Sequence, residues 1–393
     1  MITRLQVRNF KSLRDVDMQF GMINVLVGSN MAGKSNILDV FRFLYEVVFP
    51  EPGSQGVSFA LAQRSGVDEV LWKGGDERLI TIALEATDPG QTNTTYKYQL
   101  ELIAGTGGYV ATQNESLKLI RSGSEHELIA VRQGFLWLKN VDGKEVGGGV
   151  GTAGETALRH AFPTWDGYRF HEMVKLWRFY HLLPPMMKES SKMASGQILD
   201  EPGGDNLSAW LMWLQTHSPD AFEKVNEVLR DLFPGLSQIR TIPTEDGNVH
   251  ISLRERGLKR PTNVWQASDG FLALTALLSL IYVPPERGGT LYCIEEPENH
   301  IHPRLLETLV ALLRQAALQA QDSKSPQAQF VFTTQSPYFL NQFSLEEMLW
   351  VEKKDGETKA YRPAGKEHLK KLVEDKDSGL GDLIYSGVLG EEE

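Results

Sequence analysis

The most informative stretch of the sequence is Gly28 to Asn36, which reads GSNMAGKSN. Its spacing matches G-x-x-x-x-G-K-[ST], with Gly33, Lys34 and Ser35 in the required positions. Glycine lets the backbone curl so that successive N–H groups face phosphate oxygens. We therefore expect a phosphate-binding loop in which Lys34 contacts the β- and γ-phosphates and the Ser35 hydroxyl binds Mg²⁺. A structural glycine turn with an incidental lysine is the alternative.

The flanking segments supply the strand and the helix that such a loop requires. Residues 22–27 are apolar and rich in β-branched side chains, apart from Asn24, so we expect a buried strand. Residues 36–48 carry apolar side chains at helical spacing, which predicts a helix whose N-terminus faces the phosphates. Asn30 and Asn36 are the other loop residues expected to contact the nucleotide.

Acidic and polar residues follow two further apolar runs near the end of the chain. Glu295 and Glu296 come directly after residues 291–294, and Gln335 follows residues 329–332. A helical pattern over residues 303–320 separates the runs, which predicts parallel strands whose carboxyl ends share one edge. We expect Glu295 to hold Mg²⁺, Glu296 to accept a proton from the attacking water, and Gln335 to sense the γ-phosphate. An ordinary strand-to-loop exit is the alternative.

A serine and a glycine open the apolar helix expected at residues 271–281. Ser268 and Gly270 could offer a hydroxyl and free N–H groups to an anion, although many helices begin at Ser or Asp. This motif and the acid pair lie far along the chain from the glycine loop. Kinases and GTPases of the P-loop class place the acid much closer, so the spacing favours a split ATPase head.

Composition limits the class of protein. The chain has 393 residues, with 41% hydrophobic and 23% charged residues, as is usual for a globular protein. The single cysteine, Cys293, excludes a disulfide framework and fits a reducing cytoplasm. No apolar run predicts a membrane span, and the first ten residues do not resemble a signal peptide. A net charge of −11 argues against nonspecific nucleic-acid binding by the whole surface.

Several other segments have two readings each. Alternating residues between 79 and 139 predict antiparallel strands, whereas Gly147–Gly154 predicts a flexible surface loop. Gln63 is either a Mg²⁺-sensing glutamine or a surface residue. Two basic groups are either solvated faces or contacts to nucleotide, DNA or a partner, and their members are Arg4, Arg8, Lys11 and Arg14, then Arg254, Arg256, Lys259 and Arg260.

The order of these motifs resembles ABC-type ATPase heads of the SMC and RecF kind. The resemblance is strongest to the predicted ATPases of the AAA15 and AAA21 group, which are related to the ATPase half of OLD nucleases. Three stretches carry it: MITRLQVRNFKSLRDVDMQF, EEPENHIHP and GLGDLIYSGVLG. Residues 60–260 resemble the group only loosely. The stretch after Gln335 is too short for the Toprim nuclease domain of OLD proteins, so any cutting of nucleic acid would fall to a partner.

The resemblance assigns roles to the motif residues. It implies that Lys34 and Ser35 bind phosphate and Mg²⁺, that Glu296 is the catalytic base, and that Ser268 and Gly270 grip ATP held by a second subunit. Asn299 and His300 would lie in the loop that crosses the dimer interface. Gln335 departs from the family, which usually has His there, and glutamine cannot carry a proton charge. Slow hydrolysis is the consequence we expect.

The combined prediction is an α/β fold: a two-lobed P-loop ATPase head with mixed and mostly parallel sheets and a small helical insertion. We expect an N-terminal lobe at 1–185, an insertion at 186–260 and a C-terminal lobe at 261–393. The leading function is binding and hydrolysis of ATP, with Mg²⁺, by a homodimer that forms around the nucleotide. The hydrolysis would drive a DNA- or partner-linked process, and the resemblance implies a role in defence or repair. A nucleotide-gated scaffold with little turnover, and a P-loop kinase or GTPase, are the alternatives.

Overall fold

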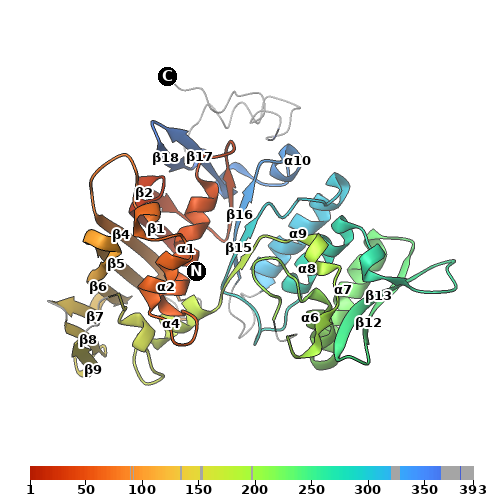
Figure 1. Ribbon diagram of the computed structural model, residues 1–393, viewed down its shortest axis with the longest axis horizontal. Helices are drawn as coiled ribbons and strands as arrows, with labels where there is room; N and C mark the ends of the chain where they lie inside the picture. Colours follow the sequence, from red (N-terminus) through yellow and green to blue (C-terminus); the bar gives the residue numbers. More distant parts are fainter. Residues whose placement is uncertain are drawn as a thin grey trace. The chain divides into compact units, whose positions relative to one another are not determined.

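The computed structural model describes residues 1–363, except 89, 92, 133–134, 151–153, 196–197 and 320–327, together with residue 381. The chain divides into two compact units, one made of Met1–Trp177 with Leu345–Lys366 and the other of Arg178–Ser344 with Glu367–Glu393. Figure 1 labels most of their helices and strands. The C-terminal stretch 379–390, which carries part of the family resemblance, lies outside the described residues apart from Gly381.

An eight-stranded antiparallel sheet forms most of the first unit. Its strand order is β2-β1-β4-β5-β6-β7-β8-β9. Burial alternates residue by residue along β4, as expected when only one face of a sheet packs on a core. The strands are β1 (Ile2–Phe10), β2 (Leu13–Gln19), β4 (Leu79–Thr87), β5 (Thr94–Ala104), β6 (Val110–Arg121), β7 (Ser124–Arg132), β8 (Phe135–Lys139) and β9 (Glu145–Val150).

The prediction of a loop over Gly147–Gly154 is wrong for its first part. Gly147, Gly148 and Gly149 lie in β9, which pairs antiparallel with β8, while residues 151–153 are outside the described residues. Glycine has no strand preference of its own, so the neighbouring strand determines this conformation. A Cβ on Gly148 would lie 2.8 Å from the Leu136 carbonyl oxygen and 3.1 Å from the Trp137 ring, and glycine therefore permits this close pairing.

A second group of strands in the first unit carries the glycine loop. The buried strand β3 (Ile23–Val27) pairs in parallel with β17 (Met348–Lys354), which pairs antiparallel with β18 (Glu357–Tyr361). After the loop comes α1 (Lys34–Val48), whose apolar stripe is buried. The ring of Phe41 packs 5.6 Å from Phe20, and that of Phe43 packs 5.4 Å from Phe10. These edge-to-face contacts fix the helix that follows the loop against β1 and the end of β2.

The remaining elements of the first unit are short. They are α2 (Gly56–Ala62), α3 (Val67–Val70), α4 (Tyr168–Lys175), and the 3₁₀ turns η1 (Thr106–Gly108), η2 (Leu158–His160) and η5 (Leu345–Glu347). The short strand β10 (Trp177–Tyr180) includes the residues at which the chain passes from the first unit to the second, and all four of its residues are buried.

The second unit contains a parallel strand pair, helices and a small antiparallel sheet. β15 (Leu291–Glu295) pairs in parallel with β16 (Gln329–Thr334), and α8 (Asp269–Ile281) contacts α9 (Pro303–Gln319). The small sheet has the order β11-β13-β12, with β14 beside β13. Its strands and the other helical elements are α5 (Pro184–Met187), β11 (Ser191–Lys192), η3 (Met193–Ser195), α6 (Leu207–His217), α7 (Pro219–Leu232), β12 (Leu236–Pro243), β13 (Asn248–Glu255), β14 (Thr262–Asn263), η4 (Val264–Gln266) and α10 (Pro337–Leu340).

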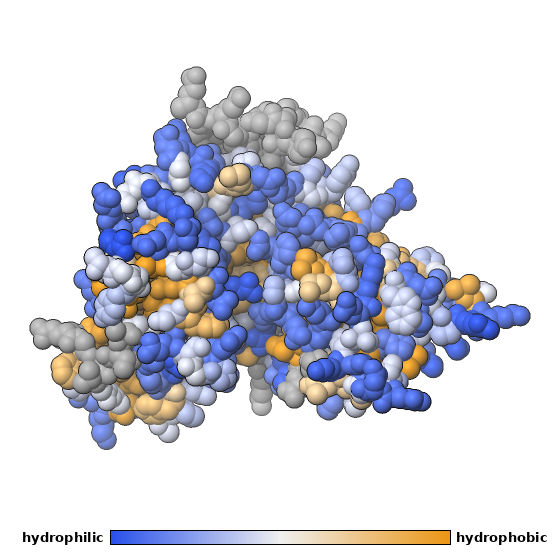
Figure 2. All heavy atoms as spheres, in the orientation of Figure 1, coloured by the Kyte–Doolittle hydropathy of each residue, from blue (hydrophilic) through white to orange (hydrophobic). Residues whose placement is uncertain are grey.

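The visible face of the molecule is largely polar. Figure 2 shows hydrophilic residues over most of the visible face, with separate apolar patches between them. Within the described ranges, no helix has both the length and the apolar character needed to span a bilayer. The mixed α/β architecture confirms the fold class expected from the sequence.

A fully buried carboxyl group ties the sheet of the first unit to the turn η2. Glu115 on β6 accepts hydrogen bonds from the Tyr98 hydroxyl at 3.0 Å and from the backbone N–H groups of Ala157 and Leu158 at 2.5 and 3.0 Å. Burial nevertheless raises the pKa of Glu115 from 4.5 to about 7, although the three donors oppose this rise. Ionising Glu115 therefore costs the folded state free energy.

This cost predicts a pH dependence of stability. The folded state holds its proton on Glu115 more tightly than the unfolded state, so the free energy of unfolding falls as the pH rises from about 4.5 to about 7. One pKa unit corresponds to about 1.4 kcal/mol, so this group contributes a fall of about 3 kcal/mol. Glu115→Gln removes the titrating group, but the NH₂ of its amide then faces one of the backbone N–H donors and cannot accept from it.

Urea unfolding at a series of pH values measures this effect. Subtracting the free energy of unfolding of Glu115→Gln from that of the wild type cancels the titration of all other groups. This difference should decrease between pH 5 and pH 8. Glu125→Gln, at an exposed site on β7, serves as the control. A wild-type-minus-variant difference that is flat across this range contradicts the buried, protonated state.

Candidate nucleotide and acid sites

The glycine loop connects β3 to α1 as the sequence predicts. Gly33 caps the helix with φ of 107°, a left-handed conformation that favours glycine. Lys34 is buried, and its Nζ donates hydrogen bonds to the carbonyl oxygens of Gly28 at 2.7 Å and of Ser29 at 3.0 Å. The loop therefore wraps around the ammonium group, and the backbone, helix N-terminus and lysine form the donor set that phosphate binding requires.

Two residues far away in the sequence support this loop, and sequence analysis missed both. The Thr358 hydroxyl on β18 donates to the Ala32 carbonyl oxygen at 2.8 Å and lies 2.6 Å from the Ser12 hydroxyl. The Asn36 side-chain amide donates to Ser12 Oγ at 2.7 Å, so this predicted nucleotide contact is also a support for the loop. A Cβ on Gly33 would lie 2.1 Å from Thr358 Oγ1, which gives a packing reason for this glycine.

The outer part of the loop is accessible. Asn30 and Ser35 are exposed, and Met31 is 85% exposed with a positive φ of 65°. Such a conformation is uncommon outside glycine and clusters at binding sites. Within the described part of the chain, no group of three or more His, Cys, Asp or Glu side chains could hold a metal ion.

The predicted base and the predicted sensor lie in contact in the second unit. Glu296 Oε1 accepts a hydrogen bond from Gln335 Nε2 at 2.9 Å, and Glu296 Oε2 accepts from Asn299 Nδ2 at 2.8 Å. Glu296 also has a positive φ of 45°. Its backbone N–H donates to the Thr333 carbonyl oxygen at 3.0 Å, which holds this strained residue in place. Glu295, the predicted Mg²⁺ ligand, ends β15 opposite Thr333 of β16.

A second carboxyl group lies behind Glu296, and sequence analysis did not identify it. Glu298 is 8% exposed and is hydrogen-bonded to the Thr334 hydroxyl, which also accepts from the Ser336 N–H at 3.0 Å. Burial raises the pKa of Glu298 to about 7. Glu298 and Thr334 thus form a second link between the chain after β15 and the end of β16. The third acid in the run EEPE was its only signal in the sequence.

The serine and glycine that open α8 have clear local roles. Ser268 is exposed and caps the helix, because its hydroxyl accepts from the Phe271 N–H at 3.3 Å. Gly270 faces the loop after β15, where a Cβ would lie 2.3 Å from the His300 carbonyl oxygen. The structure therefore brings Gly270 together with the Asn299–His300 loop inside one chain.

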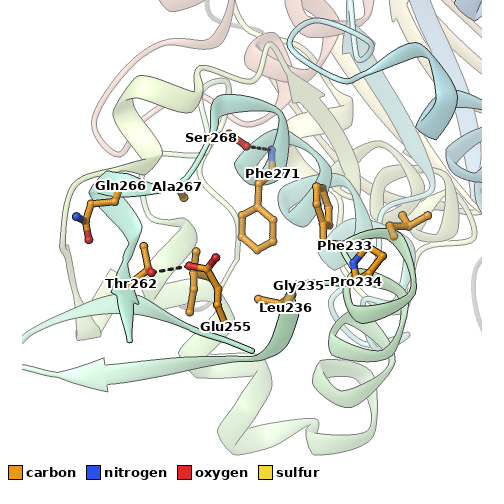
Figure 3. Close-up of a pocket in the computed structure, with 12 residues that line it drawn as sticks. Phe233, Pro234, Gly235, Leu236, Glu255, Thr262, Gln266, Ala267, Ser268 and Phe271 are labelled. Atoms are coloured by element: carbon orange, nitrogen blue, oxygen red, sulfur yellow. Dashed lines mark hydrogen bonds between the residues drawn. The ribbon is translucent and has the colours of Figure 1, made fainter. Parts of the chain in front are cut away.

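An apolar pocket adjoins this helix start, with a volume of about 380 Å³. Figure 3 shows the residues that line this pocket. Ser268 and Phe271 come from the start of α8, and Phe233, Leu236 and Glu255 come from other elements. The rings of Phe233 and Phe271 lie 5.2 Å apart, and Glu255 accepts a hydrogen bond from the Thr262 hydroxyl at 2.5 Å. No pattern in the sequence indicates this pocket, because its walls come from separate elements.

The other candidates from the sequence have these positions. Gln63 lies exposed at the end of α2. Each member of the first basic group forms an ion pair. The pairs are Arg4 with Asp17, Arg8 with Glu77, Lys11 with Asp39, and Arg14 with Glu357. Arg254, Arg256, Lys259 and Arg260 are exposed. Their contacts to Mg²⁺, nucleotide, DNA or a partner stay predictions.

Two family models match the chain. One, described as "AAA ATPase domain", matches residues 1–89. The other, described as "AAA domain, putative AbiEii toxin, Type IV TA system", matches residues 149–341. An OLD nuclease of Thermus scotoductus is 42% identical over 50 residues, a match that spans 13% of this chain and 10% of that nuclease.

Solved structures show the same fold. An SMC head bound to the C-terminal winged-helix domain of ScpA has a TM-score of 0.55 and 16% identity, covering 94% of this chain and 99% of that one. An SMC head with an extended coiled coil, from Pyrococcus furiosus and bound to the C-terminal domain of ScpA, has a TM-score of 0.52 and 13% identity, covering 95% and 99%. The solved structures confirm the fold, and the two family models together with the glycine loop confirm the resemblance to SMC- and OLD-like P-loop ATPases.

Proposed function

We propose that the protein binds ATP with Mg²⁺ and hydrolyses it slowly, and that two copies pair around two nucleotides. In this proposal each copy supplies Lys34 and the acid pair to its own nucleotide and Ser268 to that of the other copy. The family supports ATP as the nucleotide. The donor set around Lys34 and the exposed Ser35 support binding of a triphosphate and its metal.

Within this proposal Ser35 and Glu295 hold Mg²⁺, which neutralises charge on the phosphates. Glu296 takes the proton of the attacking water, and Gln335 orients the groups around the γ-phosphate. Asn30, Gly33 and Asn36 shape the loop around the triphosphate. Lys34 begins α1, Glu295 ends β15, and Gln335 follows β16 directly.

One observation supports the proposal most strongly: both carboxylate oxygens of Glu296 accept hydrogen bonds from amide side chains, those of Gln335 and Asn299. The predicted base and sensor are therefore coupled directly. The two amide donors hold the Glu296 carboxylate in one orientation. They also occupy two of its roughly four acceptor sites, so they compete with the attacking water for the carboxylate.

The same observation favours a second candidate function. If Gln335 and Asn299 prevent Glu296 from accepting the proton of water, ATP acts mainly as a switch for pairing. The protein is then a nucleotide-gated regulator of a partner effector such as a nuclease. A DNA-linked role in defence or repair belongs to either version. The two versions differ in the rate of phosphate release.

Removal of Lys34 tests nucleotide binding. Lys34→Ala should weaken ATP binding by at least about a hundredfold, because it removes the buried cation from the phosphate cradle. Equilibrium titration with a fluorescent ATP analogue measures the change. Lys144→Ala, at an exposed turn, is the matched control and should bind as the wild type does. Equal binding by Lys34→Ala and Lys144→Ala would show that the loop is a structural turn.

Substitution of Glu296 tests the assigned base. Glu296→Gln should lower phosphate release by roughly 10²- to 10³-fold, because it removes a general base, while ATP binding is retained. Phosphate release under saturating ATP and Mg²⁺ measures the change, with the exposed Glu307→Gln on α9 as the control. Turnover by Glu296→Gln that equals that of the control would refute this role.

Substitution of Gln335 separates the two candidate functions. Gln335→His supplies a side chain that can accept and carry a proton, so phosphate release should rise severalfold above that of the slow wild type. The same phosphate assay measures it, and Gln342→His, after α10, controls for the added histidine. A wild type that is already fast, and that slows on Gln335→His, would eliminate the gated-scaffold version.

A further inference from the structure

Residues 268–270 at the start of α8, called the signature below, include an acid at the place where the proposed function requires an anion to bind. Asp269 stands between Ser268 and Gly270, and its side chain is 35% exposed. A carboxylate in the first turn suits the helix dipole. It also repels a triphosphate brought to the same turn by a second copy, since like charges at an interface disfavour association. The negative charge of Asp269 must therefore be balanced before the two copies pair.

The structure provides this balance from a distant part of the chain. Lys188 follows α5, and its Nζ lies 2.6 Å from Asp269 Oδ1. The hydrogen bond to Lys188 lowers the pKa of Asp269, so the two side chains form a charged pair. His300 Nδ1 lies 3.9 Å from the other carboxylate oxygen and adds a second cation when it is protonated. Lys188 and His300 thus face Asp269 from two different loops.

The backbone fixes the second of these loops against the signature. The His300 carbonyl oxygen occupies the space that a side chain on Gly270 would fill. His300 itself has a positive φ of 70°, and its neighbour Asn299 holds Glu296. Asp269 therefore lies beside the loop that holds the proposed base, Glu296.

We infer that Lys188 is a positioning residue for ATP-driven pairing. It neutralises Asp269 and holds that carboxylate, so that the exposed Ser268 and the N-terminus of α8 can receive the triphosphate of a second copy. This inference rests on the proposed function and deepens it: Lys188, which lies outside the nucleotide-binding motifs, balances the charge of the signature. Half-exposed ion pairs contribute little to folding, so loss of Lys188 should change pairing and leave the fold intact.

The experiment uses the full chain in the Glu296→Gln background and measures mass against ATP concentration in the presence of Mg²⁺. Lys188→Ala should raise the ATP concentration for half-maximal pairing on the order of tenfold, because Asp269 then lacks its partner. Lys188→Arg should pair as the parent does. Lys192→Ala, an exposed lysine in the same segment, controls for general loss of charge.

A second substitution separates charge balance from structural damage. Asp269→Asn added to Lys188→Ala should restore pairing, because the unbalanced acid is gone, while binding of a fluorescent ATP analogue to monomers should match the parent in every variant. Unchanged pairing in Lys188→Ala, or no recovery in the double variant, would overturn this inference alone. A Glu296→Gln parent that never pairs with ATP would overturn the proposed function and this inference with it.

Discussion

The parallel pairing of β15 with β16 is the constraint on which the chemistry of the second unit depends. Because the two strands run in the same direction and in register, Glu295 ends opposite Thr333. The residues that follow each strand then meet: Glu296 bonds to Gln335, and Glu298 bonds to Thr334. The left-handed turn at Glu296 bends the chain sharply at this point. One of these hydrogen bonds joins the candidate base to the candidate sensor, and the other holds the two segments together beside them.

The glycine loop of the first unit depends on a similar long-range contact. β18 brings Thr358 against Ala32 and Ser12, and β17 passes so close to Gly28 that a Cβ there would lie 1.9 Å from the Val351 carbonyl oxygen. Any side chain at Gly28 or Gly33 would displace these strands. The loop is therefore shaped as much by its packing against β17 and β18 as by its own sequence.

Local patterns in the sequence predicted the elements that carry the motifs. The strand before the glycine loop, the helix after it and the parallel strands that end at the acids follow from short runs of residues, because each run buries its own apolar side chains. The partners of those motifs could not be predicted this way. Thr358, Glu298 and Lys188 act through contacts with residues far away in the sequence, and no periodicity reveals such contacts. β9 was missed because three glycines become a strand only when β8 lies beside them.

The central claim is that ATP brings two copies of this chain together. The most direct test is the mass in solution of the Glu296→Gln protein, measured without nucleotide, with ADP and Mg²⁺, and with ATP and Mg²⁺. The account predicts a monomer in the first two conditions and a dimer with ATP, and predicts that Lys34→Ala in the same protein abolishes the dimer. A protein that binds ATP yet keeps the mass of a single chain would contradict the account.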